Sequence, residues 1–106
     1  MNDLISIVVP CYNESEALPK FIEVLDGIIA KMDYADFQVV LVNDGSRDKT
    51  LEVMKAIAQT RPYIKYVSFS RNFGKEAAIC AGLAQAEGDV VAVMDCDLQH
   101  PPETLL

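Results

Sequence analysis

Short apolar runs alternate with amphipathic segments along this chain of 106 residues. Four runs rich in β-branched and aromatic residues predict strands, at residues 4–9, 37–42, 63–69 and 89–94. Two segments with apolar residues at helical spacing predict helices, one at residues 16–32 and one that begins at a cap at 46 or 48 and ends at about 58. A third segment, rich in alanine, predicts a helix at residues 75–87. This order predicts an α/β fold, a mostly parallel, Rossmann-like sheet with helices on both faces and right-handed crossovers.

Two details of the pattern predict where individual elements lie. The run 90–94 contains no polar residue, which is typical of a strand that is buried on both faces. Polar and apolar residues alternate in 63–69, which indicates a strand nearer to the edge of the sheet. Cys80, in the third predicted helix, is expected in the core because free cysteines are usually buried.

Composition and charge narrow the classes of protein that fit. Apolar residues make up 51% of the chain, so a real core is possible, and the length suits one small domain. The formal net charge of −7 argues against a nucleic-acid-binding protein, which would carry a basic face. No apolar run approaches the roughly 18 residues of a membrane span. The three cysteines lack paired spacing and no signal peptide is visible, which indicates reduced thiols in a cytoplasmic setting.

A polar loop follows each predicted strand, at the sheet edge where ligands bind in folds of this kind. The last loop opens with Asp95-Cys96-Asp97. Side chains at positions i and i+2 of an extended chain face the same way, so these two carboxylates repel each other unless a cation lies between them. Hard oxygen ligands suit Mg²⁺ or Mn²⁺, which also bind substrate phosphates. The pair therefore predicts metal-assisted chemistry on a diphosphate.

The loops after the first two strands offer groups that suit a nucleotide. Tyr12 offers an aromatic face for stacking, and Glu14 and Asp44 offer acceptors for the N–H of a base such as uracil. Gly45 and Ser46 keep the second loop small, so that a ligand can approach the backbone. The first loop lacks the G-x-G-x-x-G of dinucleotide-binding enzymes, and no P-loop is present.

Taken together, four motifs resemble the inverting family-2 glycosyltransferases of GT-A fold, over essentially the whole chain. The motifs are Val8-Val9-Pro10-Cys11-Tyr12-Asn13-Glu14, Val42-Asn43-Asp44-Gly45-Ser46, Arg71-Asn72-Phe73-Gly74-Lys75-Glu76-Ala77-Ala78 and Asp95-Cys96-Asp97-Leu98-Gln99-His100-Pro101-Pro102-Glu103. The third motif is similar to the polyprenyl-phosphate branch, which includes dolichol-phosphate mannose synthases and bactoprenol glucosyltransferases. Residues 1–106 then correspond to the nucleotide-binding half of the GT-A fold.

The resemblance implies a nucleotide-sugar donor, with a UDP-sugar favoured and a GDP-sugar possible. The positions that it implies for base and ribose are Pro10, Tyr12, Glu14 and Asp44, with Lys75 at the base or a phosphate. Asp95 and Asp97 match the D-x-D motif. Asp97, helped by Gln99, would ligate Mg²⁺ or Mn²⁺, and Asp95 would ligate it too or hold the ribose.

The resemblance also implies a reaction. A metal ion acting as a Lewis acid takes up charge on the leaving diphosphate. The acceptor in this branch is a lipid phosphate, which is already anionic and needs little help from a base, and displacement inverts the anomeric carbon. The pattern at 101–106 predicts the start of a helix at the end of the chain, so we expect residues 1–106 to be the N-terminal part of a longer enzyme at the cytoplasmic face of a membrane. Alone, it should turn over little.

Other interpretations of these residues stay open. Asp95 and Asp97 also suit a helix cap or a solvated loop, and His100 suits either a metal ligand or a plain loop residue. A zinc site from Cys11, Cys96 and His100 lacks C-x-x-C support. A receiver-type signalling module needs acids after strands one and three, whereas here they follow strands two and four. A nucleotidyltransferase would be expected to carry a glycine-rich basic loop after strand one.

Overall fold

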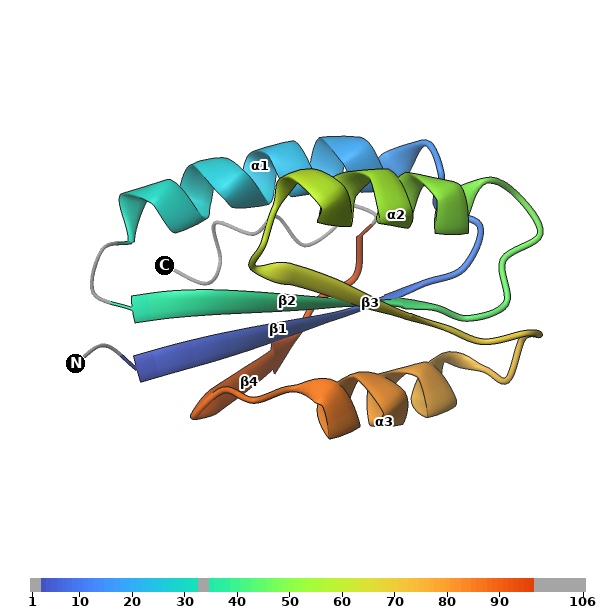
Figure 1. Cartoon of the computed structure of the whole chain (residues 1–106). Helices are drawn as coiled ribbons and strands as arrows, with labels where there is room; N and C mark the ends of the chain where they lie inside the picture. Colours follow the sequence, from blue (N-terminus) through green and yellow to red (C-terminus); the bar gives the residue numbers. More distant parts are fainter. Residues whose placement is uncertain (1–2, 33–34, 97–106) are drawn as a thin grey trace.

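A four-stranded parallel sheet with the order β3-β2-β1-β4 forms the centre of the molecule. The structure, a computed structural model, describes residues 3–32 and 35–96. In these ranges the elements are β1 (Asp3–Cys11), α1 (Ala17–Lys31), β2 (Ala35–Asn43), α2 (Thr50–Thr60), β3 (Ile64–Ser68), α3 (Lys75–Gln85) and β4 (Val90–Val93). Helices α1 and α2 cover one face of the sheet and α3 covers the other (Figure 1). The predicted α/β fold is confirmed, as is the position of β3 at an edge.

Hydrophobic packing on both faces explains why β1 and β2 are almost continuously apolar. Val9 and Leu41 belong to the larger core cluster, which includes the inner side of α1, whereas Val8 and Val42 pack on the other face with Ala78 of α3. Small residues let α3 lie close to the sheet: a Cβ atom added at Gly82 would lie 2.3 Å from Cγ1 of Val8. None of the helices within the described ranges combines the length and the apolar character that crossing a bilayer requires.

Two expectations about burial are wrong. The strand β4 pairs only with β1 in the described sheet, and Val90 is 55% exposed and Val93 44% exposed, so the apolar run marks an edge strand and not a buried one. Cys80 is exposed. It lies two positions from both Ala78 and Gly82, which face the sheet, and a step of two residues in a helix turns a side chain to the opposite side.

The carboxylate of Asp48 joins the residue two positions before α1 to the first residue of α2. It accepts hydrogen bonds from the backbone N–H of Thr50 (2.9 Å) and the hydroxyl of Ser15 (2.8 Å), and also contacts the Thr50 hydroxyl. Burial alone would raise the pKa of Asp48, but the hydrogen bonds from Thr50 and Ser15 outweigh it and lower the pKa to about 2. The Ser15 hydroxyl thus bonds to the loop after β2, and Glu16 occupies the cap position of α1.

We expect replacement of Asp48 by asparagine to destabilise the protein at pH 7 and to matter less in acid. The folded-state pKa of about 2 lies below the ordinary value of 3.8, so the stabilisation is present above pH 3.8 and is lost as the pH falls through 2. Urea unfolding of both proteins between pH 7 and pH 3 measures the difference in free energy of unfolding. A difference that does not shrink towards pH 3 would contradict this role.

Candidate functional site

A cavity of about 230 Å³ opens at the carboxyl ends of β1, β2 and β4. It brings together six predicted site residues from four separate segments of the chain, together with two cysteines. The lining residues are Pro10, Cys11, Tyr12, Glu14, Asp44, Lys75, Asp95 and Cys96. Asp97 and Gln99, predicted as metal ligands, and His100 lie outside the described residues.

An ion pair closes one side of this cavity. The ammonium of Lys75, the first residue of α3, lies 2.8 Å from Oδ1 of Asp95, the second residue beyond β4. The Lys75 side chain is 59% exposed and that of Asp95 35% exposed, so both groups face solvent and a ligand can reach them. A lysine at a helix N-terminus meets the positive end of the helix dipole, and Asp95 offsets that unfavourable contact.

The Asp44 carboxylate is almost fully buried and is held by the loop that precedes α3. Its Oδ1 accepts from the backbone N–H of Phe73 (2.8 Å) and its Oδ2 from the side-chain amide of Asn72 (3.0 Å). The same amide nitrogen also donates to the backbone carbonyl of Asp44 (3.1 Å). Sequence reasoning placed Asp44 at the ligand but missed these two partners, although the motif around Asn72 was already singled out.

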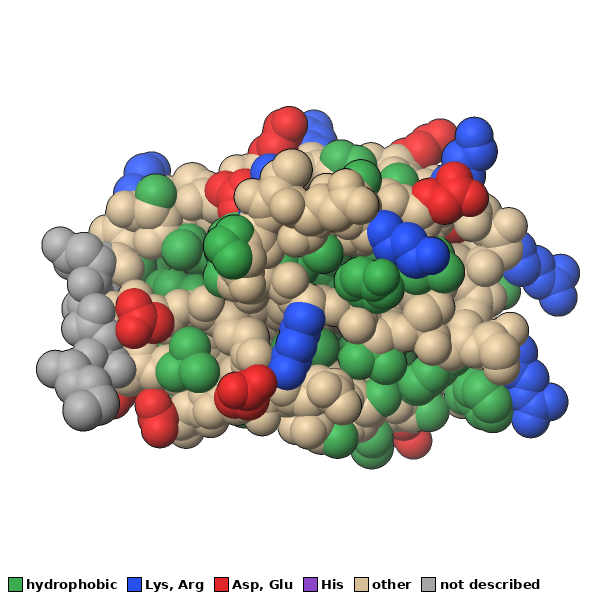
Figure 2. Space-filling model, viewed as in Figure 1, with side chains coloured by type: hydrophobic (Ala, Val, Ile, Leu, Met, Phe, Trp, Pro, Cys, Tyr) green, Lys and Arg blue, Asp and Glu red, His purple; other side chains and the backbone are tan. Residues whose placement is uncertain are grey.

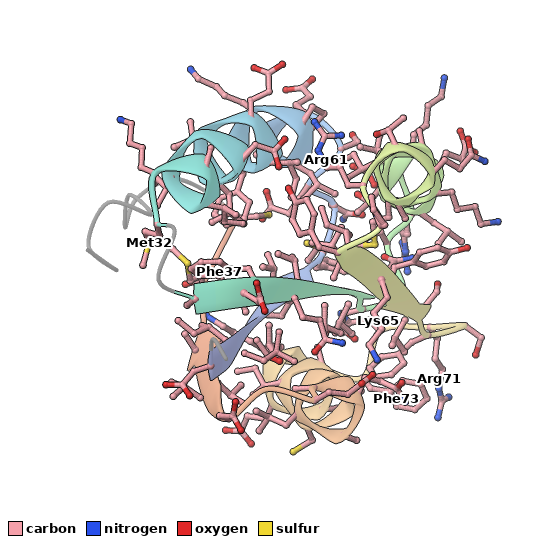
Figure 3. The ribbon with its side chains drawn as sticks, turned by 60° about the vertical axis from the view of Figure 1, so that its left-hand side comes forward. Met32, Phe37, Arg61, Lys65, Arg71 and Phe73 are labelled. Carbon is pink, nitrogen blue, oxygen red and sulfur yellow. The ribbon has the colours of Figure 1, made fainter. Side chains whose placement is uncertain are left out.

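Gly45 allows two loops to touch backbone to backbone: the second loop, which follows β2, and the third loop, residues 69–74 between β3 and α3. Its φ of +65° is in the left-handed region, and an added Cβ atom would lie only 2.1 Å from the carbonyl carbon of Arg71. Beyond this contact the third loop turns outward: the Arg71 guanidinium lies 4.7 Å above the ring of Phe73 (Figure 3). Hydrophobic side chains also reach the surface over α3 and the loop before it (Figure 2).

Hydrogen bonds join the loop after β1 to the loop after β2, and the Tyr12 side chain stays exposed. Asn13 has a φ of 55°; its backbone N–H donates to the Ser46 hydroxyl (2.9 Å), and its side-chain oxygen accepts from the backbone N–H of Arg47 (2.8 Å). The backbone N–H of Glu14 donates to the hydroxyl of Thr50 (2.9 Å). Tyr12, at 43% exposed, thus presents its ring at the cavity on a fixed backbone.

Two buried thiols meet in the wall of the cavity. The Cys11 thiol donates to the sulfur of Cys96 at 3.7 Å, and each residue is 2% exposed. This hydrogen bond and burial raise the pKa of the Cys11 thiol well above its ordinary value, so it stays protonated at neutral pH. His100, the third member of the alternative zinc site, lies outside the described residues.

Thiol labelling should therefore show one fast and two slow cysteines. A thiol reagent such as Ellman's reagent should modify Cys80 rapidly, because it is exposed, while Cys11 and Cys96 react only slowly until the protein unfolds. Replacement of Cys80 by serine should remove the fast phase and leave the slow one. Three equal rates, or a fast phase that survives this replacement, would contradict the burial of the thiol pair.

The described residues offer one accessible carboxylate, that of Asp95, to a divalent cation at this corner of the cavity. Among residues 3–32 and 35–96, no group of three or more His, Cys, Asp or Glu side chains could hold a metal ion. Mg²⁺, however, usually takes only one or two protein carboxylates and completes its shell with waters and substrate phosphates. The accessible carboxylate of Asp95 could fill one such position once the Lys75 ammonium has turned away, because two cations beside one carboxylate repel each other.

Comparison with known proteins gives the family. The model of the family "Glycosyl transferase family 2" matches residues 6–106. The chain is 41% identical over 104 residues to undecaprenyl-phosphate 4-deoxy-4-formamido-L-arabinose transferase of Pseudomonas aeruginosa, covering 97% of this chain and 30% of that protein. It is 44% identical over 101 residues to the bactoprenol glucosyl transferase of Shigella phage SfV, covering 95% of this chain and 33% of that protein. The chain thus spans about 30% of the length of these curated relatives.

Solved structures share the architecture. Mannosyltransferase PcManGT from Pyrobaculum calidifontis, in complex with GDP-Man and Mn²⁺, aligns with a TM-score of 0.78 and 26% identity, over 92% of this chain and 28% of that one. S. aureus TarS 1–349 in complex with UDP aligns with a TM-score of 0.74 and 30% identity, over 92% of this chain and 28% of that one.

Proposed function

Because the chain belongs to glycosyl transferase family 2 and has the architecture of the N-terminal part of a GT-A fold, we propose that its cavity binds the nucleotide of a sugar-nucleotide donor. The full-length protein would transfer a hexose from this donor to a polyprenyl phosphate with inversion. The observation that carries the proposal is the convergence of six residues from four segments, each predicted to meet a nucleotide, on one cavity.

The base would lie against the first two loops. The exposed ring of Tyr12 offers a stacking surface. Each oxygen of the Asp44 carboxylate receives one protein donor, and a carboxylate has about four acceptor positions, so it retains capacity for the N–H of a base. UDP is favoured over GDP because the third loop resembles the bactoprenol branch. Related structures hold UDP or GDP-Man, which supports a nucleoside diphosphate without choosing the base.

The diphosphate would lie between α3 and the end of β4. Asp95, with Asp97 and Gln99, would hold Mg²⁺ or Mn²⁺, which supplies Lewis-acid stabilisation of the leaving diphosphate. The Lys75 ammonium, which carries three N–H donors at the end of a flexible side chain, can turn from Asp95 to a phosphate oxygen. The Mn²⁺ complex of the related mannosyltransferase supports this assignment.

The names of two relatives support a proposal for the acceptor. These relatives are named for undecaprenyl phosphate and for bactoprenol, which supports a lipid-phosphate acceptor. Such an acceptor lies in a membrane, and the proposal extends to action of the full-length protein at the cytoplasmic face. On this view residues 1–106 are the N-terminal, donor-binding part of the catalytic domain, and the acceptor is held by other parts of the full-length enzyme. The chain by itself is then expected to turn over little or no substrate.

Calorimetry on the full-length protein tests the proposal. UDP-sugars, GDP-sugars and nucleoside triphosphates would be titrated with Mn²⁺ and, as control, with EDTA. We expect a UDP-sugar to bind most tightly and to lose most of its affinity in EDTA. Tightest binding of a triphosphate would favour a nucleotidyltransferase. No metal-dependent binding of any of these ligands would refute the proposal.

A further inference from the structure

We propose that Asn72 is a positioning residue for donor binding, which acts by holding Asp44 and by setting where α3 begins. This inference rests on the proposed function and extends it to a residue outside the cavity lining. Asn72 does not need to touch the nucleotide. Its contribution would be to hold the Asp44 carboxylate and the Lys75 ammonium in their positions in the site.

The hydrogen bonds of the Asn72 side chain converge on a single residue, Asp44. Its amide nitrogen donates to Oδ2 of Asp44 at 3.0 Å and to the backbone carbonyl of Asp44 at 3.1 Å. Next to it, the backbone N–H of Phe73 donates to Oδ1 of Asp44 at 2.8 Å. With one donor fixed on each oxygen, the carboxylate plane cannot rotate, and its remaining acceptor positions point in a constant direction. A base N–H would therefore meet a preorganised acceptor.

These hydrogen bonds to Asp44, here called the Asp44 clamp, also fix the start of α3, the helix that carries Lys75. The backbone of Arg71 and Asn72 packs on Gly45, where an added Cβ atom would lie 2.1 Å from the Arg71 carbonyl carbon and 2.3 Å from the Asn72 nitrogen. Gly74 then turns the chain at a φ of +101° and Lys75 begins α3. Lys75 comes only three residues after Asn72, and its ammonium reaches Asp95 at 2.8 Å. Movement of Asn72 would therefore shift both ends of the donor site.

Two substitutions separate this role from simple support of the fold. Asn72→Ala removes the donor to a buried carboxylate, and we expect about 10- to 100-fold weaker binding of UDP with Mn²⁺ at every pH. Asn72→Asp places a second carboxyl group beside Asp44. At pH 8 the introduced carboxylate repels the Asp44 carboxylate, so binding should be weak. A neighbouring negative charge raises the pKa of the introduced group, so towards pH 5.5 it can take up a proton, and its O–H can then donate to Asp44 as the amide did. Its affinity should then recover at least severalfold relative to wild type.

The measurement is calorimetry or fluorescence titration of the full-length wild-type protein and its variants with UDP and Mn²⁺ from pH 8 to pH 5.5. Affinities are expressed as ratios to wild type at the same pH, which removes the titration of UDP and of the groups that share the cavity. Those groups are Cys11, Tyr12, Glu14, Lys75, Asp95 and Cys96. Gln85→Glu adds the same charge at the far end of α3 and should stay within about twofold of wild type at every pH.

The outcomes distinguish the two proposals. Failure of wild type to bind any nucleotide would refute the proposed function and this inference with it. Wild-type binding with an unchanged affinity in Asn72→Ala would overturn the inference alone. Weak binding by Asn72→Asp at all pH values would also overturn it, because it would show a structural requirement without the acid-dependent rescue. If Asn72→Ala fails to fold, the pH profile of Asn72→Asp decides by itself.

Discussion

Replacing Asp95 with asparagine is expected to weaken the Mn²⁺-dependent binding of a UDP-sugar by at least about a hundredfold. Mutation of a residue that only hydrogen-bonds to a metal ligand typically lowers metal affinity or activity 10- to 100-fold. Mutation of a ligand itself should therefore lower it by at least about 100-fold. The change keeps the size of the side chain and removes its charge. The effect should be much smaller in EDTA, because only metal-linked binding depends on the carboxylate charge.

Asp89 provides the matched control for this experiment. It lies at the opposite end of β4, where its carboxylate accepts from the backbone N–H of Leu4 at 3.0 Å, far from the carboxyl-end cavity. Asp89→Asn makes the same chemical change and keeps an acceptor, so donor affinity should stay within about twofold of wild type. If Asp95→Asn behaved like Asp89→Asn in the presence of Mn²⁺, Asp95 could not be a metal ligand.

Replacing Gly45 with alanine is expected to lower the free energy of unfolding by about 2–5 kcal/mol. The backbone strain of a φ of +65° in a residue with a Cβ atom costs about 1–3 kcal/mol, and overpacking commonly costs a similar amount. The atoms in the way are backbone atoms of Arg71 and Asn72, 2.1 to 2.5 Å from the added carbon, and cannot move aside as a flexible side chain would. The third loop would have to leave the second.

Two other glycines separate the contributions. Gly27 lies inside α1 with nothing within 4 Å of an added Cβ atom, so Gly27→Ala should stabilise the protein by about 0.5–1 kcal/mol. Gly74 also has open space but a φ of +101°, so Gly74→Ala should show the strain without the clash. Urea unfolding of the three variants measures this order. Equal stability of the Gly45 and Gly27 variants would show that the two loops are not in contact as described.

The fold was predictable because the spacing of apolar residues differs between the strands of the sheet and the helices that cover it. The inner strands β1 and β2 are packed on both faces and are therefore almost continuously apolar, while the apolar residues of α1 recur at helical spacing. The exposure of β4 was not predictable, because an apolar run looks the same whether or not something covers it. Cys80 was misplaced because an average preference of cysteine for the core overrode its place on the outer side of α3.

The membership of the cavity was predictable, whereas its internal bonding was not. Parallel strands bring their carboxyl ends to one edge, so polar residues in the following loops must meet there, as Tyr12, Asp44 and Asp95 do. The clamp on Asp44 joins residues 28 and 29 positions apart in the sequence. Nothing local to either segment reveals which amide will face which carboxylate. Whether Asp97 and Gln99 complete the site stays a prediction.

A crystal structure of the full-length protein with Mn²⁺ and a UDP-sugar tests the central claim most directly, because manganese can be located by its anomalous scattering. We predict manganese bound to a carboxylate oxygen of Asp95 and to the diphosphate, Lys75 turned from Asp95 to a phosphate oxygen, and the base against Tyr12 and Asp44. A nucleotide bound elsewhere, or a metal site without Asp95, would contradict the account.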